Sequence, residues 1–260
     1  VVCNTLYEAN MMFQVISNYI DDVLFFPMDD FITSKVIATS PELKNTRLET
    51  IDELISSEKS IVITNLMGFL RYLPSKEIYL NNNLLLEIGK EYKKNILLEK
   101  LYNMGYERES LVTKTGELAE RGFILDVFPI NEKNPIRIEF FDDVIESIRI
   151  FDVDNQLTIK KIDKININPN TEVLFNNKLE KTQTDNKIVS IIQYMTNPKI
   201  IIDDLNKLKI GYKILQEDII NYNKENNSND KYMFSLETLL NNYIYFEKND
   251  NYDNNIDSIK

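Results

Sequence analysis

Residues 123–151 read FILDVFPINEKNPIRIEFFDDVIESIRIF, and this stretch indicates the fold of the domain that contains it. Arg137 and Glu139 alternate with apolar residues, a pattern of period two that is typical of a half-exposed strand. Asp142 and Asp143 separate two apolar runs and predict a hairpin turn. With the apolar helix expected before it, the stretch predicts a small α+β domain built from antiparallel hairpins.

On both sides of this domain the sequence alternates between short apolar runs and amphipathic segments. The apolar runs predict buried strands, and these lie at residues 1–3, 23–26, 61–64 and 199–204. The amphipathic segments predict helices, and these start after Thr5 and Ser40 or cover residues 188–195, 205–223 and 236–241. This order of elements predicts an α/β domain with a parallel sheet.

The chain therefore reads as one α/β domain that is interrupted by an inserted α+β domain. The alternation of strands and helices stops near residue 84 and returns after Pro169. We predict four parts: residues 1–83 as the first part of the α/β domain, 84–170 as the inserted domain, 171–248 as the second part of the α/β domain, and 249–260 as a polar tail or linker.

The composition argues against several functions. The 260 residues carry a net charge of −11, and an acidic chain repels phosphate, so we expect weak or no DNA binding. The chain has no histidine and its six glycines form no phosphate-binding motif, so we expect no catalytic, metal or cofactor site. One cysteine and no apolar run long enough for a membrane predict a cytoplasmic location without a membrane partner.

Four motifs in fixed order carry a resemblance to a known family. They are Y-x-R at 106–108, R-G-x-I-L-D-V-F-P at 121–129, P-x-R-I-E-F-F-D-D at 135–143 and S-I-R-x-F-D at 147–152. Together they resemble the inserted domain that UvrB shares with bacterial transcription-repair coupling factors. The resemblance covers residues 1–246 and is strongest between 105 and 152.

The resemblance implies a degenerate helicase-like domain of the RecA or P-loop type and a non-catalytic adaptor role. Such a module recruits UvrA to stalled RNA polymerase by mimicking UvrB, while a separate motor of the longer protein uses ATP and magnesium. In that family a C-terminal domain masks the UvrA-binding surface. The coupling factor is preferred to UvrB because residues 26–40 are too few for UvrB's tyrosine-rich hairpin, which grips DNA.

Two alternatives stay open. The chain could be part of an active UvrB-type ATPase and helicase subunit of the excinuclease, which requires a P-loop, or a structural α/β module without a partner. Asp203 and Asp204 end a predicted strand, as the acids of an ATPase do. Without a P-loop lysine in the chain, we expect them to have a structural role.

The resemblance assigns the UvrA-binding surface to five residues: Arg108, Arg121, Phe128, Arg137 and Glu139. Arginine suits such a surface because its planar guanidinium binds carboxylates with two hydrogen bonds. Read from spacing alone, the charged residues favour exposed cross-strand ion pairs, each contributing roughly 0–1 kcal/mol; the resemblance favours the interface. Phe128 could equally be a core residue. Where the UvrB pattern has a second arginine, two positions before Arg121, this chain has Ala119.

Overall fold

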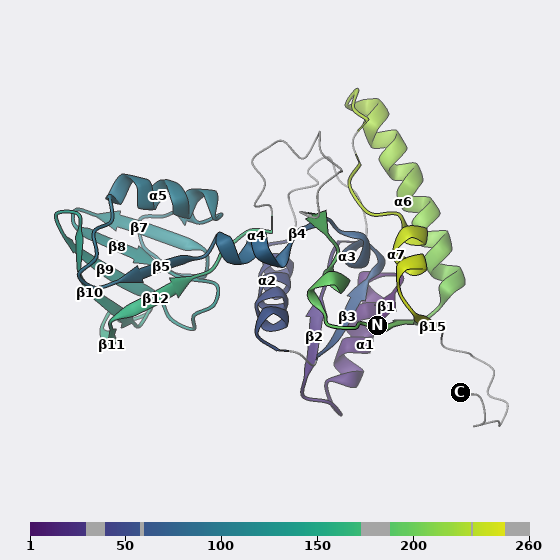
Figure 1. Cartoon of the computed structure of the whole chain (residues 1–260), viewed down its shortest axis with the longest axis horizontal. Coiled ribbons are helices and arrows are strands. Elements are labelled where there is room, and N and C mark those ends of the chain that lie inside the picture. Colours follow the sequence, from purple (N-terminus) through teal and green to yellow (C-terminus); the bar gives the residue numbers. More distant parts are fainter. Residues whose placement is uncertain (30–39, 58–59, 173–187, 230, 248–260) are drawn as a thin grey trace. The chain divides into compact units, whose positions relative to one another are not determined.

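The computed structural model describes residues 1–29, 40–57, 60–172, 188–229 and 231–247 (Figure 1). The predicted tail at 249–260 lies outside the described residues, as does most of the connection over 26–40. The chain divides into two compact units. The parallel-sheet unit comprises Val1–Ser40, Glu58–Tyr72 and Ser190–Lys260, and the insertion unit comprises Pro41–Ser57 and Leu73–Val189. This division assigns 41–57, 73–83 and 171–189 differently from the predicted domain ranges, which stay a prediction.

The parallel-sheet unit confirms the predicted fold class. In the described part of this unit, a five-stranded sheet has the order β15-β14-β1-β3-β2 and every neighbouring pair is parallel. Its strands are β1 (Val2–Cys3), β2 (Val23–Phe26), β3 (Ile61–Asn65), β14 (Ile200–Ile202) and β15 (Tyr245–Glu247). Its helices are α1 (Leu6–Ile16), α3 (Leu66–Leu70), the 3-10 turn η1 (Ile191–Tyr194), α6 (Leu205–Glu225) and α7 (Leu236–Asn242).

Helices cover both faces of this sheet, as in a doubly wound fold. On one face, Ala9 of α1 packs with Cys3, Val23 and Ile63 of the strands. The other face is covered by residues of α3, η1, α6 and α7, which pack against β1 and β14. Helix α1 begins where the sequence predicts, because Thr5 accepts a hydrogen bond from the Glu8 N–H and the Glu8 carboxylate accepts one from the Thr5 N–H.

The helix predicted over 188–195 is wrong. Residues Ile188–Val189 form strand β13, which pairs with β4 (Leu73–Pro74) in the insertion unit. The turn η1 follows, and Ser190 precedes it with its N–H bonded to the side chain of Gln193. Most residues of the run are buried, including the consecutive Val189–Ile192, so its apolar residues fit a short strand and a tight turn as well as a helix.

The insertion unit is built on a six-stranded sheet of order β11-β10-β9-β8-β7-β6, antiparallel except for the pair β6–β7. Its strands are β6 (Glu107–Arg108), β7 (Glu117–Arg121), β8 (Ile124–Val127), β9 (Ile136–Phe141), β10 (Val144–Phe151) and β11 (Thr158–Ile162). A second pair joins β5 (Leu84–Glu87) to β12 (Lys164–Ile167). The helices of this unit are α2 (Pro41–Ser56), α4 (Lys76–Asn81) and α5 (Lys94–Asn103).

The six-stranded sheet has two unlike faces. Helix α5 lies against its inner face (Figure 1). The two form one apolar core, to which β9 contributes Ile136, Ile138 and Phe140. The intervening residues of β9, Arg137 and Glu139, lie on the opposite face, which we call the outer face. The prediction that these two charged residues share a face is confirmed.

Candidate protein-interaction site

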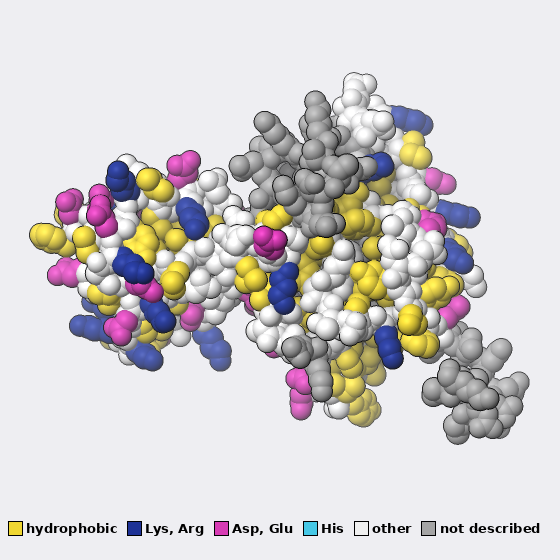
Figure 2. All heavy atoms as spheres, in the orientation of Figure 1, with side chains coloured by type: hydrophobic (Ala, Val, Ile, Leu, Met, Phe, Trp, Pro, Cys, Tyr) yellow, Lys and Arg dark blue, Asp and Glu magenta, His cyan; other side chains and the backbone are white. Residues whose placement is uncertain are grey.

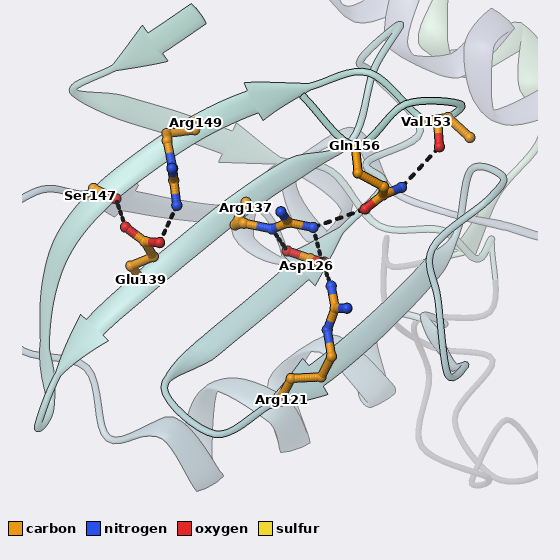
Figure 3. Close-up of polar contacts among 8 residues, drawn as sticks. All are labelled: Arg121, Asp126, Arg137, Glu139, Ser147, Arg149, Val153 and Gln156. Carbon is orange, nitrogen blue, oxygen red and sulfur yellow. Dashed lines mark hydrogen bonds and ion pairs between the residues drawn. The ribbon is translucent and has the colours of Figure 1, made fainter. Parts of the chain in front are cut away.

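A buried carboxylate, Asp126 of β8, organises the outer face of the six-stranded sheet. Arg137 binds it with two hydrogen bonds, Nε to Oδ1 at 2.7 Å and Nη2 to Oδ2 at 2.8 Å. Arg121, from the end of β7, adds a third through Nη2 to Oδ2 at 2.6 Å. Figure 3 shows the carboxylate between the two guanidinium groups. Because these bonds are charge-assisted, they hold both arginines in defined orientations.

Further contacts fix Arg137 from the neighbouring strand and loop. Its Nη2 also donates to Oε1 of Gln156 at 3.0 Å. Its guanidinium lies 4.4 Å from the ring centroid of Phe151, a cation–π contact. The hydrogen bonds and charge of Asp126 raise the pKa of Arg137, although burial acts in the other direction. Arg137 is therefore a permanently charged and rigidly held part of the outer face.

A second carboxylate, Glu139, lies beside this group. Its Oε2 accepts a hydrogen bond from the Ser147 hydroxyl at 2.6 Å, and its Oε1 forms an ion pair with Arg149 of β10 (Figure 3). Register explains the arrangement, because Glu139 lies opposite Ser147 and Arg137 lies opposite Arg149. The outer face thus carries three arginines and two carboxylates in one continuous polar layer.

The three arginines differ in how much of each side chain solvent reaches. Arg137 is 18% exposed and Arg149 is 25% exposed, whereas Arg121 is 49% exposed. Arg121 is therefore held by Asp126 at one end of its guanidinium and remains open to another molecule. Of the predicted binding residues on this face, it has the most accessible charge.

Arg108, which was predicted to share this surface, lies on the other side of the sheet. In the β6–β7 pair it is the register partner of Leu118, a residue of the inner core. Its Nη2 lies 3.3 Å from Glu120, the carboxylate that also pairs with Lys94 of α5. The expectation that Arg108 shares one face with Arg121 and Arg137 is therefore wrong, because the family motif carries residue order but not the register that sets the side of the sheet. Its contact with UvrA stays a prediction.

Phe128 has the core role of its two predicted interpretations. It is buried and packs with Val112 and Ala119 in a small cluster on the outer face. Ala119 occupies the position where the UvrB pattern has an arginine, and here that position is filled by apolar packing. Phe128 therefore cannot serve as an exposed anchor for a partner in this conformation.

Asp126 was missed as a site residue, although a signal was present. It interrupts the apolar run of β8, and a charged residue inside such a run is rarely buried without a partner of opposite charge. The register places Asp126 opposite Arg137 of β9. Asp126 and Arg137 each interrupt an apolar run, and the two runs are predicted to be neighbouring strands. This combination of opposite charges could have identified the pair.

In the parallel-sheet unit, polar residues that follow the strands have structural roles. Asp204 caps α6 by accepting a hydrogen bond from the Lys207 N–H at 2.9 Å. The side-chain amide of Asn65, the last residue of β3, bonds to both the N–H and the carbonyl of Met28. The carboxyl ends of parallel strands are where nucleotides bind in doubly wound folds. At this edge, the side chains of Asp204 and Asn65 are thus hydrogen-bonded to backbone groups of the chain itself.

The described residues contain no helix long and apolar enough to cross a membrane. They also contain no group of three or more histidine, cysteine, aspartate or glutamate side chains placed to hold a metal ion.

Comparison with known protein families shows which kind of domain carries this site. A family model described as the UvrB interaction domain matches residues 84–173, which contain the whole six-stranded sheet. Residues 84–173 therefore belong to the UvrB interaction domain family, a protein–protein interaction module by its description. The polar layer belongs to this domain.

The chain beyond this domain is also related to known proteins. It is 34% identical over 191 residues to the transcription-repair-coupling factor of Bacillus subtilis, covering 73% of this chain and 16% of that protein. It is 33% identical over 214 residues to the same factor from Staphylococcus epidermidis, covering 82% of this chain and 18% of that protein. The resemblance to transcription-repair coupling factors is confirmed, and the chain spans less than a fifth of the length of these relatives.

Proposed function

We propose that this chain is the UvrA-docking segment of a transcription-repair coupling factor and that the outer face of its six-stranded sheet is the docking surface. One observation carries the proposal: a UvrB interaction domain presents the half-exposed Arg121 on a face where Asp126 orders the arginines. The segment has no catalytic role in this proposal. It recruits UvrA to stalled RNA polymerase by presenting the surface that UvrB presents.

The order of the outer face supports a recognition role. An arginine that searches many rotamers loses conformational entropy when it binds, and this loss weakens the complex. Here Asp126 holds Arg121 and Arg137 before any partner arrives. A carboxylate on the partner would therefore meet a guanidinium in a defined orientation, which favours specific charge pairing.

The test is a titration of purified UvrA against the chain, with Arg121→Glu compared with Arg108→Glu. Both variants reverse one exposed arginine on the same sheet, but Arg108 lies on the side of α5. We expect Arg121→Glu to weaken binding by about tenfold or more, since like charges across an interface cost several kcal/mol. Arg108→Glu should stay within about threefold of the unchanged chain, because a charge outside an interface has a small effect.

The possible results separate the parts of the proposal. If UvrB competes with the chain for UvrA, the shared surface is supported. Equal loss of binding in the two variants would show that the outer face is not the docking surface. An unchanged chain that does not bind UvrA at any salt concentration would refute the adaptor function.

The proposal also concerns cofactors and other partners. ATP and magnesium act in the motor of the longer protein, and this segment binds neither, which agrees with the structural use of Asp204 and Asn65. The net charge of −11 supports weak or absent DNA binding. A C-terminal domain of the longer protein is the expected intramolecular partner of the outer face. Calorimetry with ATP and a DNA-binding titration would test the first two statements.

A further inference from the structure

Two phenylalanines are exposed at one end of the six-stranded sheet. Phe141, the last residue of β9, is 76% exposed, and Phe123, in the turn between β7 and β8, is 68% exposed. Val144, the first residue of β10, is also exposed. We call these three residues the apolar tip. Figure 2 shows hydrophobic side chains reaching the surface of this unit among the charged ones.

Backbone contacts bring the three residues of the apolar tip together. Phe141 and Val144 are register partners across the hairpin turn of β9 and β10. The N–H of Phe140 donates to the carbonyl of Phe123 at 2.9 Å, which places Phe123 beside the end of β9. The two hairpin turns therefore end side by side and present their apolar residues at the same end of the sheet.

These side chains are not needed for the core of the unit. The inner core at this end already contains Phe140 and Ile145, both buried. Isolated exposed apolar residues are ordinary on protein surfaces, but three exposed apolar residues at one end of a sheet offer apolar surface to a partner. The apolar tip is therefore accessible to a partner.

The apolar tip borders the outer face. Ile124 of β8 is the register partner of both Arg121 and Glu139. Phe141 follows Glu139 by two residues on the same strand, so it projects from the same face. The most accessible arginine and the most exposed phenylalanine of this face thus lie on β7 and β9, with β8 between them.

We propose that the apolar tip is the hydrophobic anchor of the docking surface and that Phe141 and Phe123 enter an apolar pocket on UvrA beside a carboxylate that binds Arg121. This inference rests on the proposed function. Binding surfaces draw most of their affinity from a few aromatic and arginine residues that are packed at a common centre. With Phe128 buried, the tip supplies the aromatic part of such a centre.

The experiment measures UvrA binding by the chain with Phe141→Ala and, separately, Phe123→Ala. We expect each to weaken binding about tenfold or more, as for an interface hot spot. Phe141→Leu should stay within about threefold because it keeps an apolar side chain of similar reach. Ile159→Ala is the matched control: Ile159 is 56% exposed on β11, beside the far end of β10. It should bind within about twofold of the unchanged chain, like most exposed residues outside a hot spot.

The outcomes separate this inference from the proposed function. If the unchanged chain binds UvrA and Arg121→Glu weakens binding, but both phenylalanine variants bind normally, the anchor is overturned and the docking surface stands. Equal losses for Ile159→Ala and Phe141→Ala would also overturn it, because the effect would not be specific to the tip. Absence of binding by the unchanged chain would refute both. Thermal melting checks folding, and unchanged transitions are expected for side chains this exposed.

Discussion

Replacing Asp126 by alanine removes the carboxylate that binds two arginines on the outer face. In the folded chain Asp126 is fully buried and accepts three charge-assisted hydrogen bonds, two of them from Arg137. Removing one partner of a buried ion pair costs about 3–5 kcal/mol, because the other charge stays buried without compensation. Arg121 is half exposed and can turn to water, so most of this cost should come from Arg137.

We therefore expect Asp126→Ala to lower the free energy of unfolding by about 3–5 kcal/mol. Asp126→Asn keeps the shape but has one acceptor oxygen in place of two, so it should cost about 1.5–3 kcal/mol, the value of a hydrogen bond to a charged group. Urea unfolding followed by circular dichroism at pH 7 measures both. Glu146→Ala on the exposed side of β10 is the control and should change stability by less than about 0.5 kcal/mol.

A double-mutant cycle tests the physical reasoning directly. The coupling energy between Asp126 and Arg137 should exceed that between Asp126 and Arg121, because Arg137 makes two bonds and is the more buried. The reverse order would refute the assignment of the cost to burial. So would a loss of less than about 1 kcal/mol in Asp126→Ala, since a buried pair of this kind should cost more.

Two further changes have calculable signs. Burial alone would raise the pKa of Glu117, but hydrogen bonds from the Thr113 N–H and hydroxyl, among others, lower it. A lowered carboxyl pKa stabilises the fold above the unfolded value of about 4.3 and loses this effect as pH falls through the folded value. Glu117→Gln should therefore cost about 1–2 kcal/mol at pH 7, and clearly less at pH 3; an equal cost at both would contradict this. Gly116→Ala places a Cβ 2.2 Å from Asn170 at a φ of +87°, whereas Gly89→Ala, at +80°, meets no atom within 4 Å. By thermal melting Gly116→Ala should be more destabilising than Gly89→Ala, which should cost about 1 kcal/mol; similar costs would show that Asn170 simply moves away.

Much of the fold could be predicted because local rules agree with the final structure. The capping box of Thr5 and Glu8, the parallel strands and the hairpin of β9 and β10 follow from spacing and turn residues alone. The segment 188–195 could not be predicted this way. Val189, Ile191, Ile192 and Tyr194 are all buried, so the apolar pattern does not distinguish a helix from a strand, and pairing with Leu73–Pro74 decided the outcome.

The candidate site divides in the same manner. Period-two alternation along one strand was enough to place Arg137 and Glu139 on a common face, because a strand turns successive side chains to opposite sides. The sequence also determined the family, because the order and spacing of the four motifs can be read without knowing the fold. These properties are local, or follow from the order of residues along the chain.

Only the tertiary structure decided which of the arginines share a partner and which aromatic residue is exposed. Register between strands places Asp126 opposite Arg137 and sends Arg108 to the side of α5. Packing of residues far apart in the chain buries Phe128 and leaves Phe141 open. Burial and cross-strand pairing depend on neighbours that meet only after folding, so a single strand's sequence does not contain them.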